Sequence, residues 1–387
     1  MKNNKITPTV YYIGVDDMDL DLFESQYEIP NGISYNSYVI MDEKIAVMDT
    51  VDDRKTQEWL DNLTKVLNGK SPDYLIVSHM EPDHGSNIEK LALEYPNMKI
   101  VGNTKTFGML SQFFDIDVSE RKVVVKEGDS LELGEHTLSF YMAPMVHWPE
   151  VMVSYESKDK ILFAADAFGK FGGISVEEDW TCEARRYYFN ICGKYGVQVQ
   201  ALLKKAAALD IEIICSLHGP VLSENIEYYI EKYNLWSSYQ PEDDGVVIAY
   251  ASIHGNTKNA VGTLADMLKE KGAKKVTVFD LSRADMAEAL EDAFRYDKLI
   301  LAAASYDGGV FPCMEDYLLH LKAKNYQKRK VGLIQNGTWA PTAGKVMKEV
   351  ICNLKEIDLC ETLVTIKSKL NEESRKDMEQ LVDEILA

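Results

Sequence analysis

The segment Tyr74-Leu75-Ile76-Val77-Ser78-His79-Met80-Glu81-Pro82-Asp83-His84, residues 74–84, joins an apolar run to a loop dense in metal-binding side chains. Residues 74–77 are typical of a buried strand. Four metal-binding side chains follow within six residues: His79, Glu81, Asp83 and His84. Open α/β sheets bind their ligands at the carboxyl ends of their strands. The segment therefore predicts an α/β fold with a metal site at the edge of a sheet.

Three more metal-binding side chains follow apolar runs elsewhere in the chain. His147 follows residues 141–146, Asp166 follows residues 161–165, and His218 follows residues 213–217. One histidine after a strand is usually a core residue, and one aspartate before glycine is usually a turn former. However, four of the seven histidines occur at these points, whereas His136, His254 and His320 remain unassigned. We therefore predict a dinuclear site: His79, Glu81 and His147 on one metal, Asp83, His84 and His218 on the other, and Asp166 bridging.

The second ligand, Glu81, decides which metal this site favours. Each metal has two nitrogen and two oxygen ligands in this arrangement, with positions left open for a small molecule. Such open histidine–carboxylate sites are used in non-haem iron oxygen chemistry. An anionic oxygen in place of a nitrogen ligand favours iron or manganese over zinc. The ligand set therefore favours an oxidoreductase over a hydrolase.

The composition excludes several classes of protein. The formal charge of −20 disfavours binding to nucleic acid or to an anionic membrane surface. No apolar run approaches the roughly 18 residues of a membrane span, and the polar start is no signal peptide. We therefore expect a cytoplasmic protein. The six cysteines form no C-x-x-C pair, which argues against a disulfide framework, an iron–sulfur centre, a zinc ribbon or a rubredoxin-like module.

The chain is long enough for two domains. Up to about residue 210, short β-rich runs alternate with turns, and helical patterns occupy residues 54–69 and 193–209. This order predicts a sandwich of two mixed sheets with helices outside. After the polar stretch 240–245, buried-strand runs alternate with helices, as in a doubly wound parallel sheet. We predict domains at residues 1–243 and 244–387.

Three loops of the second domain form a candidate flavin site. The turn Ser252-Ile253-His254-Gly255-Asn256-Thr257 precedes a helix, whose free amides and dipole suit a single phosphate such as that of FMN. It is neither a Walker loop nor a dinucleotide fingerprint. The loops Ser305-Tyr306-Asp307-Gly308-Gly309-Val310-Phe311 and Asn336-Gly337-Thr338-Trp339 follow two later strands. Tyr306 and Trp339 are placed to flank a flat ring, although either aromatic alone is as readily a core or rim residue.

With these motifs, the chain resembles the flavodiiron proteins, or A-type flavoproteins, over nearly its whole length, in their short two-domain class. The resemblance implies a metallo-β-lactamase-like αββα sandwich followed by a flavodoxin-like domain. The metal ligands of the family match His79, Glu81, Asp83, His84, His147, Asp166 and His218. Its phosphate loop matches residues 252–257, and its isoalloxazine loops match residues 305–311 and 336–339. The implied cofactors are two iron ions and FMN.

The resemblance implies reduction of O2 to water, of NO to N2O, or both. It also implies an external electron donor such as rubredoxin and a head-to-tail homodimer, with pairing into tetramers left open. Many members carry a histidine near the diiron pocket in a segment like residues 22–27. This chain has no histidine before His79.

Two other functions remain as alternatives. One is a metallo-β-lactamase-superfamily hydrolase fused to a flavodoxin domain, which would contain zinc without iron. The other is a non-enzymatic electron carrier whose first domain serves only for docking and holds no metal. Glu81 argues against the first alternative, and the full set of seven ligands argues against the second.

Overall fold

The computed structural model describes residues 4–387 and divides into two compact units. The first unit comprises Met1–Tyr188 and Val197–Asn234, and the second comprises Phe189–Gly196 and Leu235–Ala387. The boundary predicted between residues 243 and 244 lies at the start of a strand of the second unit. Two segments before this boundary, residues 189–196 and 235–242, also belong to the second unit, because they pack against it. For example, the ring of Tyr239 lies 6.4 Å from that of Phe294.

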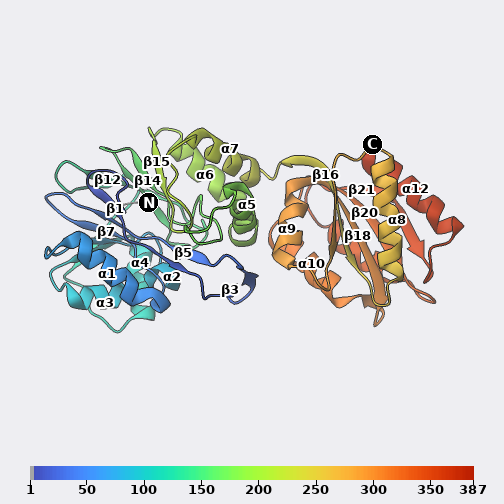
Figure 1. The fold of residues 1–387 in the computed structure, drawn as a ribbon, viewed down its shortest axis with the longest axis horizontal. Helices are drawn as coiled ribbons and strands as arrows, with labels where there is room; N and C mark the ends of the chain where they lie inside the picture. The colour runs from blue at the N-terminus through green and yellow to red at the C-terminus, as the bar shows by residue number, and fades with distance from the viewer. Residues whose placement is uncertain (1–3) are drawn as a thin grey trace. The chain divides into compact units, whose positions relative to one another are not determined.

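Two mixed sheets form the centre of the first unit (Figure 1). In spatial order, the strands of the first sheet are β1 (Val10–Tyr12), β6 (Tyr38–Ile40), β7 (Ala46–Met48), β8 (Tyr74–Ile76), β9 (Lys99–Gly102) and β10 (Lys122–Val124). Those of the second sheet are β11 (Ser130–Glu132), β12 (Thr137–Met142), β13 (Met152–Glu156), β14 (Ile161–Phe163) and β15 (Ile213–Cys215). Two small ribbons pair β2 (Val15–Asp17) with β5 (Ile33–Tyr35), and β3 (Leu22–Phe23) with β4 (Tyr27–Glu28).

The two sheets pack face to face because each buries an apolar face in one shared core. Ile40, Met48 and Ile76 of the first sheet belong to the same buried cluster as Phe140 and Phe163 of the second. Burial of apolar area is the main favourable term in folding. The predicted sandwich of two mixed sheets is confirmed.

Helices cover the outer faces of this sandwich (Figure 1). They are η1 (Asp53–Lys55), α1 (Thr56–Leu67), α2 (Pro82–Gly85), α3 (Ile88–Glu94), α4 (Thr104–Phe113), α5 (Trp180–Ile191), α6 (Gly196–Ala206) and α7 (Ile226–Ser237). The short η2 (Gly193–Tyr195), between α5 and α6, belongs to the second unit. α1 buries Trp59, Leu63 and Leu67 along one stripe, the spacing of an amphipathic helix. The short α2 carries two of the predicted ligands, Asp83 and His84.

The second unit is a five-stranded parallel sheet with helices on both faces. Its strands, in spatial order, are β17 (Val276–Asp280), β16 (Asp243–Ala251), β18 (Tyr296–Tyr306), β20 (Lys330–Asn336) and β21 (Asp358–Ile366), and the short β19 (Gly309–Val310) pairs antiparallel with β18. Its helices are α8 (Asn256–Glu270), α9 (Met286–Arg295), α10 (Pro312–Ala323), α11 (Ala343–Ile351) and α12 (Glu372–Leu386). α8 and α12 share one core cluster with the sheet. The predicted doubly wound parallel sheet is confirmed.

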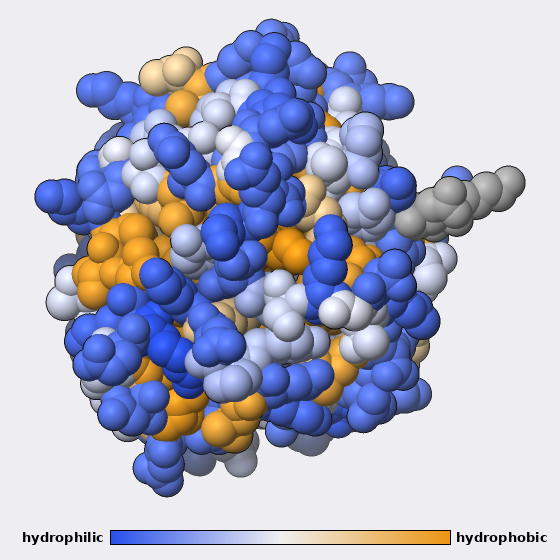
Figure 2. All heavy atoms as spheres, turned by 90° about the vertical axis from the view of Figure 1, so that its left-hand side faces the viewer, coloured by the Kyte–Doolittle hydropathy of each residue, from blue (hydrophilic) through white to orange (hydrophobic). Residues whose placement is uncertain are grey.

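Figure 2 shows one face of the first unit, on which hydrophilic side chains predominate and hydrophobic ones form small, separate patches. This surface agrees with the acidic composition of the chain. Within residues 4–387, every helix is too short or too polar to cross a lipid bilayer.

Candidate metal centre

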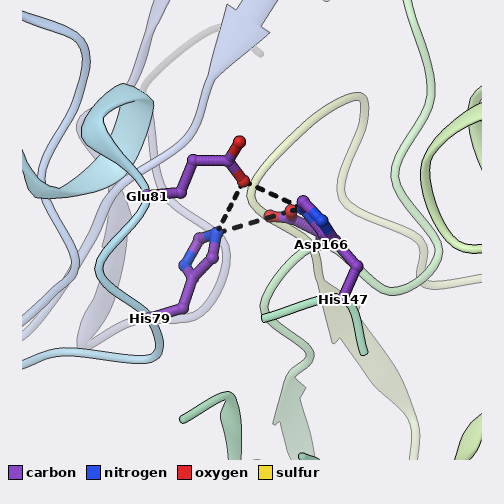
Figure 3. Close-up of side chains that lie close together, drawn as sticks. All are labelled: His79, Glu81, His147 and Asp166. Carbon is purple, nitrogen blue, oxygen red and sulfur yellow. Dashed lines mark hydrogen bonds and ion pairs between the residues drawn. The ribbon is translucent and has the colours of Figure 1, made fainter. Parts of the chain in front are cut away.

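The predicted metal ligands lie together at one end of the sandwich, in two adjoining groups. The first group is His79, Glu81, His147 and Asp166, and the second is Asp83, His84 and His218. Within each group the candidate ligand atoms lie within 4.8 Å of one another. Figure 3 shows the first group converging from separate loops. Glu81 lies 2.9 Å from the Nε2 atom of His147, and Asp166 lies 3.4 Å from that of His79.

Asp166 faces both groups. Its Oδ2 atom lies 3.1 Å from Nε2 of His147, while its Oδ1 atom lies 4.0 Å from Nε2 of His84. In the second group, Nε2 of His84 lies 3.1 Å from Nε2 of His218, and Asp83 lies 3.2 Å from the same His218 atom. A carboxylate with one oxygen toward each group has the geometry of a bridging ligand.

One sequence expectation about this site is wrong. His147 was expected directly after a strand, but β12 ends at Met142 and His147 lies in the loop before β13. The apolar run at residues 141–146 predicts a strand up to His147, but only its first two residues are in β12, and Met145 adopts a left-handed backbone conformation that is incompatible with extended structure. The other ligands lie at or shortly after strand ends, with Asp83 and His84 in the short helix α2.

Electrostatics within the cluster shift the pKa values of all seven side chains. Burial would lower the pKa of His147, but Asp166 and Glu81 outweigh it and raise that pKa to about 10. Burial would raise the pKa of Glu81, but His147 and His79 lower it to about 2. The neighbouring carboxylates likewise raise the pKa of His79 well above its ordinary value. Strongly shifted groups gathered in one place are characteristic of functional sites.

The second group is more deeply buried, and burial determines the direction of the pKa shift for two of its three members. Burial and the nearby Glu81 raise the pKa of Asp83 to about 7. Burial and His218 lower the pKa of His84, whereas Asp83 outweighs burial and raises that of His218. Burial would raise the pKa of Asp166, but the histidines around it, led by His79, hold it well below the ordinary range.

The donor set fits two metal ions. Within residues 4–387, both oxygens of Asp83 and both ring nitrogens of His79 are buried without a hydrogen-bond partner. Buried polar groups normally have partners. Two imidazole nitrogens of His84 and His218 also face each other, as do the carboxylates and histidines of the first group. Metal ions would satisfy these atoms, and the mixture of nitrogen and anionic oxygen suits iron.

Outer residues that sequence reasoning missed hold the ligands in place. The backbone oxygen of Ser34 lies 2.7 Å from Nδ1 of His218, which leaves Nε2 for the cluster. Asp49 accepts hydrogen bonds from the amide and hydroxyl of Ser78, the residue before His79. Glu150 accepts one from the amide of Met80, between His79 and Glu81. Asp49 had a usable signal, since it follows the apolar run 45–48 just as the ligands follow theirs.

A third group of metal-binding residue types, His136, Glu156 and Asp159, is explained by structure alone. Nε2 of His136 lies 2.8 Å from the hydroxyl of Thr9. Both oxygens of Glu156 accept hydrogen bonds from backbone amides, and Asp159 accepts a hydrogen bond from the hydroxyl of Thr7. These contacts tie the amino-terminal segment to β12 and β13.

The second unit contains a cavity of about 530 Å³ at the carboxyl edge of its sheet, within the size range of cofactor sites. Of the predicted flavin-site residues, Ser252, Ile253, His254, Asn256, Thr257, Ser305, Tyr306, Asp307, Gly308, Asn336, Gly337, Thr338 and Trp339 line it. Gly255, Gly309, Val310 and Phe311 belong to the same loops but not to the lining. Sequence reasoning missed Ala304, Ala340, Thr342 and Ser368, which also line the cavity.

The first loop of this cavity leaves backbone donors for an anion. The hydroxyl of Ser252 accepts hydrogen bonds from the amides of Gly255 and Lys258. The amides of Asn256 and Thr257 belong to the first turn of α8, which has no acceptor inside the helix. Trp339 is 91% exposed and Tyr306 45% exposed, so neither is a core residue. Both aromatics are therefore available to a ligand at the rim.

Comparison with known proteins agrees with this architecture. A family model described as "ODP family beta lactamase" matches residues 33–219. The rubredoxin oxygen:oxidoreductase of Desulfovibrio gigas superposes with a TM-score of 0.92 at 25% identity, covering 98% of this chain and 97% of the other. A mutant flavo di-iron protein from Thermotoga maritima superposes at 0.88 with 26% identity, covering 98% and 96%.

A relative with a curated name points the same way. The anaerobic nitric oxide reductase flavorubredoxin of Vibrio vulnificus is 27% identical over 381 residues, which cover 95% of this chain and 75% of the relative. The chain belongs to the flavodiiron protein family. In this chain, a β-lactamase-like unit with the candidate metal ligands precedes a flavodoxin-like unit with the cavity. Members of this family carry a flavin and a non-haem iron centre.

Proposed function

We propose that this flavodiiron protein is an oxidoreductase that reduces O2 to water, NO to N2O, or both. The observation that carries the proposal is the convergence of seven candidate ligands, with Glu81 among them, into two groups that Asp166 faces with one oxygen each. The names of the D. gigas and V. vulnificus proteins, an oxygen oxidoreductase and a nitric oxide reductase, support it. A fused hydrolase is not favoured, because its zinc site would not call for Glu81.

Each of the two groups of residues would hold one iron ion. The cavity of the second unit would hold FMN. When bound, two ferrous ions and reduced FMN would together supply four electrons, enough to convert O2 to two waters and more than two NO need to form N2O. Asp83, His84 and His218 would bind one ion, and His79, Glu81 and His147 the other. Asp166 would fix their separation.

The burial of the ligands indicates the side from which a small substrate enters. The side chains of His147, Glu81 and Asp83 are 11%, 12% and 10% exposed, whereas those of His79, His84 and His218 are fully buried. Behind His218, the rings of Phe23, Tyr35 and Tyr187 lie 5.4, 6.1 and 5.4 Å from the imidazole. These aromatics exclude water from that side, so a small substrate is expected to enter past the partly exposed His147, Glu81 and Asp83.

Electrons would reach the flavin from a separate donor. Rubredoxin is named with the D. gigas enzyme, and the V. vulnificus relative is called a flavorubredoxin. A rubredoxin-type donor is therefore proposed here. The head-to-tail homodimer implied by the family resemblance also stays a prediction, and light scattering of the purified protein tests it.

The function is tested by metal and flavin analysis, followed by anaerobic measurement of O2 and NO consumption with one reduced donor. We expect two irons and one FMN per chain and consumption of at least one of the two gases. Glu81→Ala and Asp83→Ala should remove iron and abolish consumption while the flavin absorption remains. Consumption that survives either substitution would contradict the ligand assignment. Zinc without iron would favour the hydrolase.

A further inference from the structure

A buried ion pair lies beside the turn that carries His218. The side chain of Lys170 is only 4% exposed, and its Nζ atom donates to Oε1 of Glu178 at 2.5 Å and to the backbone oxygen of Phe171 at 3.0 Å. The other carboxylate oxygen of Glu178 accepts a hydrogen bond from Asn31 at 2.8 Å. Lysine is almost never fully buried unless it is paired. The pairing with Glu178 therefore explains how Lys170 can be buried in this region.

The contacts of this pair link three segments of the first unit into a ring. Lys170 follows the ligand Asp166 in one loop and packs against Gly219, the residue after His218, in a second. Gly219 donates its amide to the hydroxyl of Ser34, whose backbone oxygen pairs with His218. From Ser34 the third segment runs back to Asn31, which holds Glu178. The ring therefore closes around the turn that presents His218.

Two glycines show that the ion pair has no spare room. A Cβ atom on Gly172 would lie 2.0 Å from Oε1 of Glu178, and one on Gly219 would lie 2.8 Å from Cγ of Lys170. Both glycines have positive φ angles, +92° and +80°, that side chains rarely adopt. Close packing of this kind transmits a displacement of Lys170 to Gly219 and hence to His218.

We propose that Lys170, through its pair with Glu178, is a positioning residue that holds His218 in the geometry needed for one of the two metal ions. This inference rests on the proposed metal function. The group of Asp83, His84 and His218 has three ligands besides the shared Asp166. Displacement of His218 would therefore remove one of only four protein ligands from that metal ion. The group of His79, Glu81 and His147 keeps its own three. Loss of the ion pair should therefore weaken the binding of one metal ion and leave the binding of the other unchanged.

The experiment uses the full-length, metal-loaded protein and measures metal per chain and the rate of metal release to a chelator. In Lys170→Met and Glu178→Gln we expect one of the two ions to leave about tenfold faster or more, as for other residues that orient metal ligands, and the second ion to leave at the wild-type rate.

Lys158→Met provides the matched control. Lys158 pairs with Glu135 at 2.5 Å in the same unit, but its side chain is 34% exposed and that of Glu135 is 75% exposed. Its loss should change neither release rate. Two slowly released ions in folded Lys170→Met and Glu178→Gln would overturn the proposal. So would simultaneous loss of both ions with a lowered melting temperature, because that is the mark of a merely structural pair.

If Lys170→Met fails to fold, Glu178→Gln decides the question, because it removes the charge and keeps the size of the side chain. Wild-type protein that does not hold two metal ions would refute the proposed function itself. That result is distinguishable from failure of the positioning role, in which the wild type and the variants behave alike.

Discussion

Asp166 is the single residue on which both metal groups depend. Its two oxygens point to different groups, with Oδ2 near His147 and Oδ1 near His84. The remaining ligands each serve one group. Its side chain is also buried, so bulk water has little access to take its place as a ligand. The consequences of changing it should therefore differ from those of changing any other ligand.

We expect Asp166→Asn to lower the metal content from two ions to fewer than one per chain, because an amide oxygen without charge binds iron more weakly at both positions. Metal analysis after gel filtration checks this. Asp159→Asn, in the third group that structure alone explains, serves as the control and should keep two ions. Retention of one full ion in Asp166→Asn would argue against bridging.

Three histidines of the metal centre have raised pKa values in the metal-free chain. Burial would lower the pKa values of His79, His147 and His218, but the carboxylates beside them raise all three. In the metal-free chain, His147 is therefore protonated near pH 7, and the raised pKa values of His79 and His218 also favour their protonated forms. The His147 proton stabilises the metal-free fold below the ordinary histidine pKa of about 6.5, and this stability is lost as the pH rises through about 10.

Metal uptake at pH 7 should therefore release protons, and apparent affinity should rise between pH 6 and pH 8. Calorimetric titration of the metal-free chain in two buffers of different ionisation enthalpy measures the number released. A heat of binding that is the same in both buffers, after correction for dilution, would contradict protonated histidines. The same titration of a His147→Ala chain should show fewer protons released.

At the scale of secondary structure, buried polar side chains fix segments that the strands alone leave free. Arg329, next to the start of β20, is 2% exposed and donates to the backbone oxygens of Phe294, Tyr296 and Tyr239. These acceptors come from α9, β18 and the segment before β16. Burial lowers the pKa of Arg329, but it remains charged at neutral pH. One guanidinium thus connects three parts of the second unit.

We expect Arg329→Met to destabilise the second unit by about 3 kcal/mol, because it leaves several buried carbonyl oxygens without donors. Chemical denaturation followed by circular dichroism measures the free energy of unfolding. Arg283→Met is the control. The side chain of Arg283 is 82% exposed, and its loss should change stability by no more than about 0.5 kcal/mol. Equal effects of the two substitutions would show that the buried hydrogen bonds contribute little.

At the scale of the whole molecule, each candidate site is built by one unit alone. The seven metal ligands all belong to the first unit, and the cavity-lining residues 252–368 all belong to the second. Each unit also has its own hydrophobic core. Binding of metal and binding of flavin should therefore be separable.

A negative charge at the start of α8 tests this separation. Ser252→Asp places a carboxylate where the flavin phosphate is expected, and like charges repel. We expect FMN affinity to fall about 100-fold, since a close charge repulsion of about 3 kcal/mol corresponds to that factor. Metal content should remain at two. Ser282→Asp, at an exposed position outside the cavity lining, should leave both unchanged. Loss of metal together with flavin would contradict independent sites.

The sequence by itself determined the architecture and the residue types of both sites. Apolar runs followed by polar loops are local signals, and the carboxyl ends of parallel strands gather such loops at one edge. The residues of segment 79–84, Asp166 and His218 were therefore recognisable, as were the three loops of the second domain. His147 was recognisable as a residue but not as a loop residue, because an apolar run does not reveal where extended backbone ends.

The sequence also predicted which ligands share a group, and the structure brings the same residues together. Only the tertiary structure decided how the two oxygens of Asp166 point and which residues hold the ligands in place. Ser34, Glu150 and Lys170 act on residues far away in the sequence, through a backbone oxygen, a carboxylate and a buried ion pair. No periodicity marks such residues, because each contact depends on how distant segments pack against one another. Local pattern therefore revealed which side chains are present, and long-range packing determined their geometry.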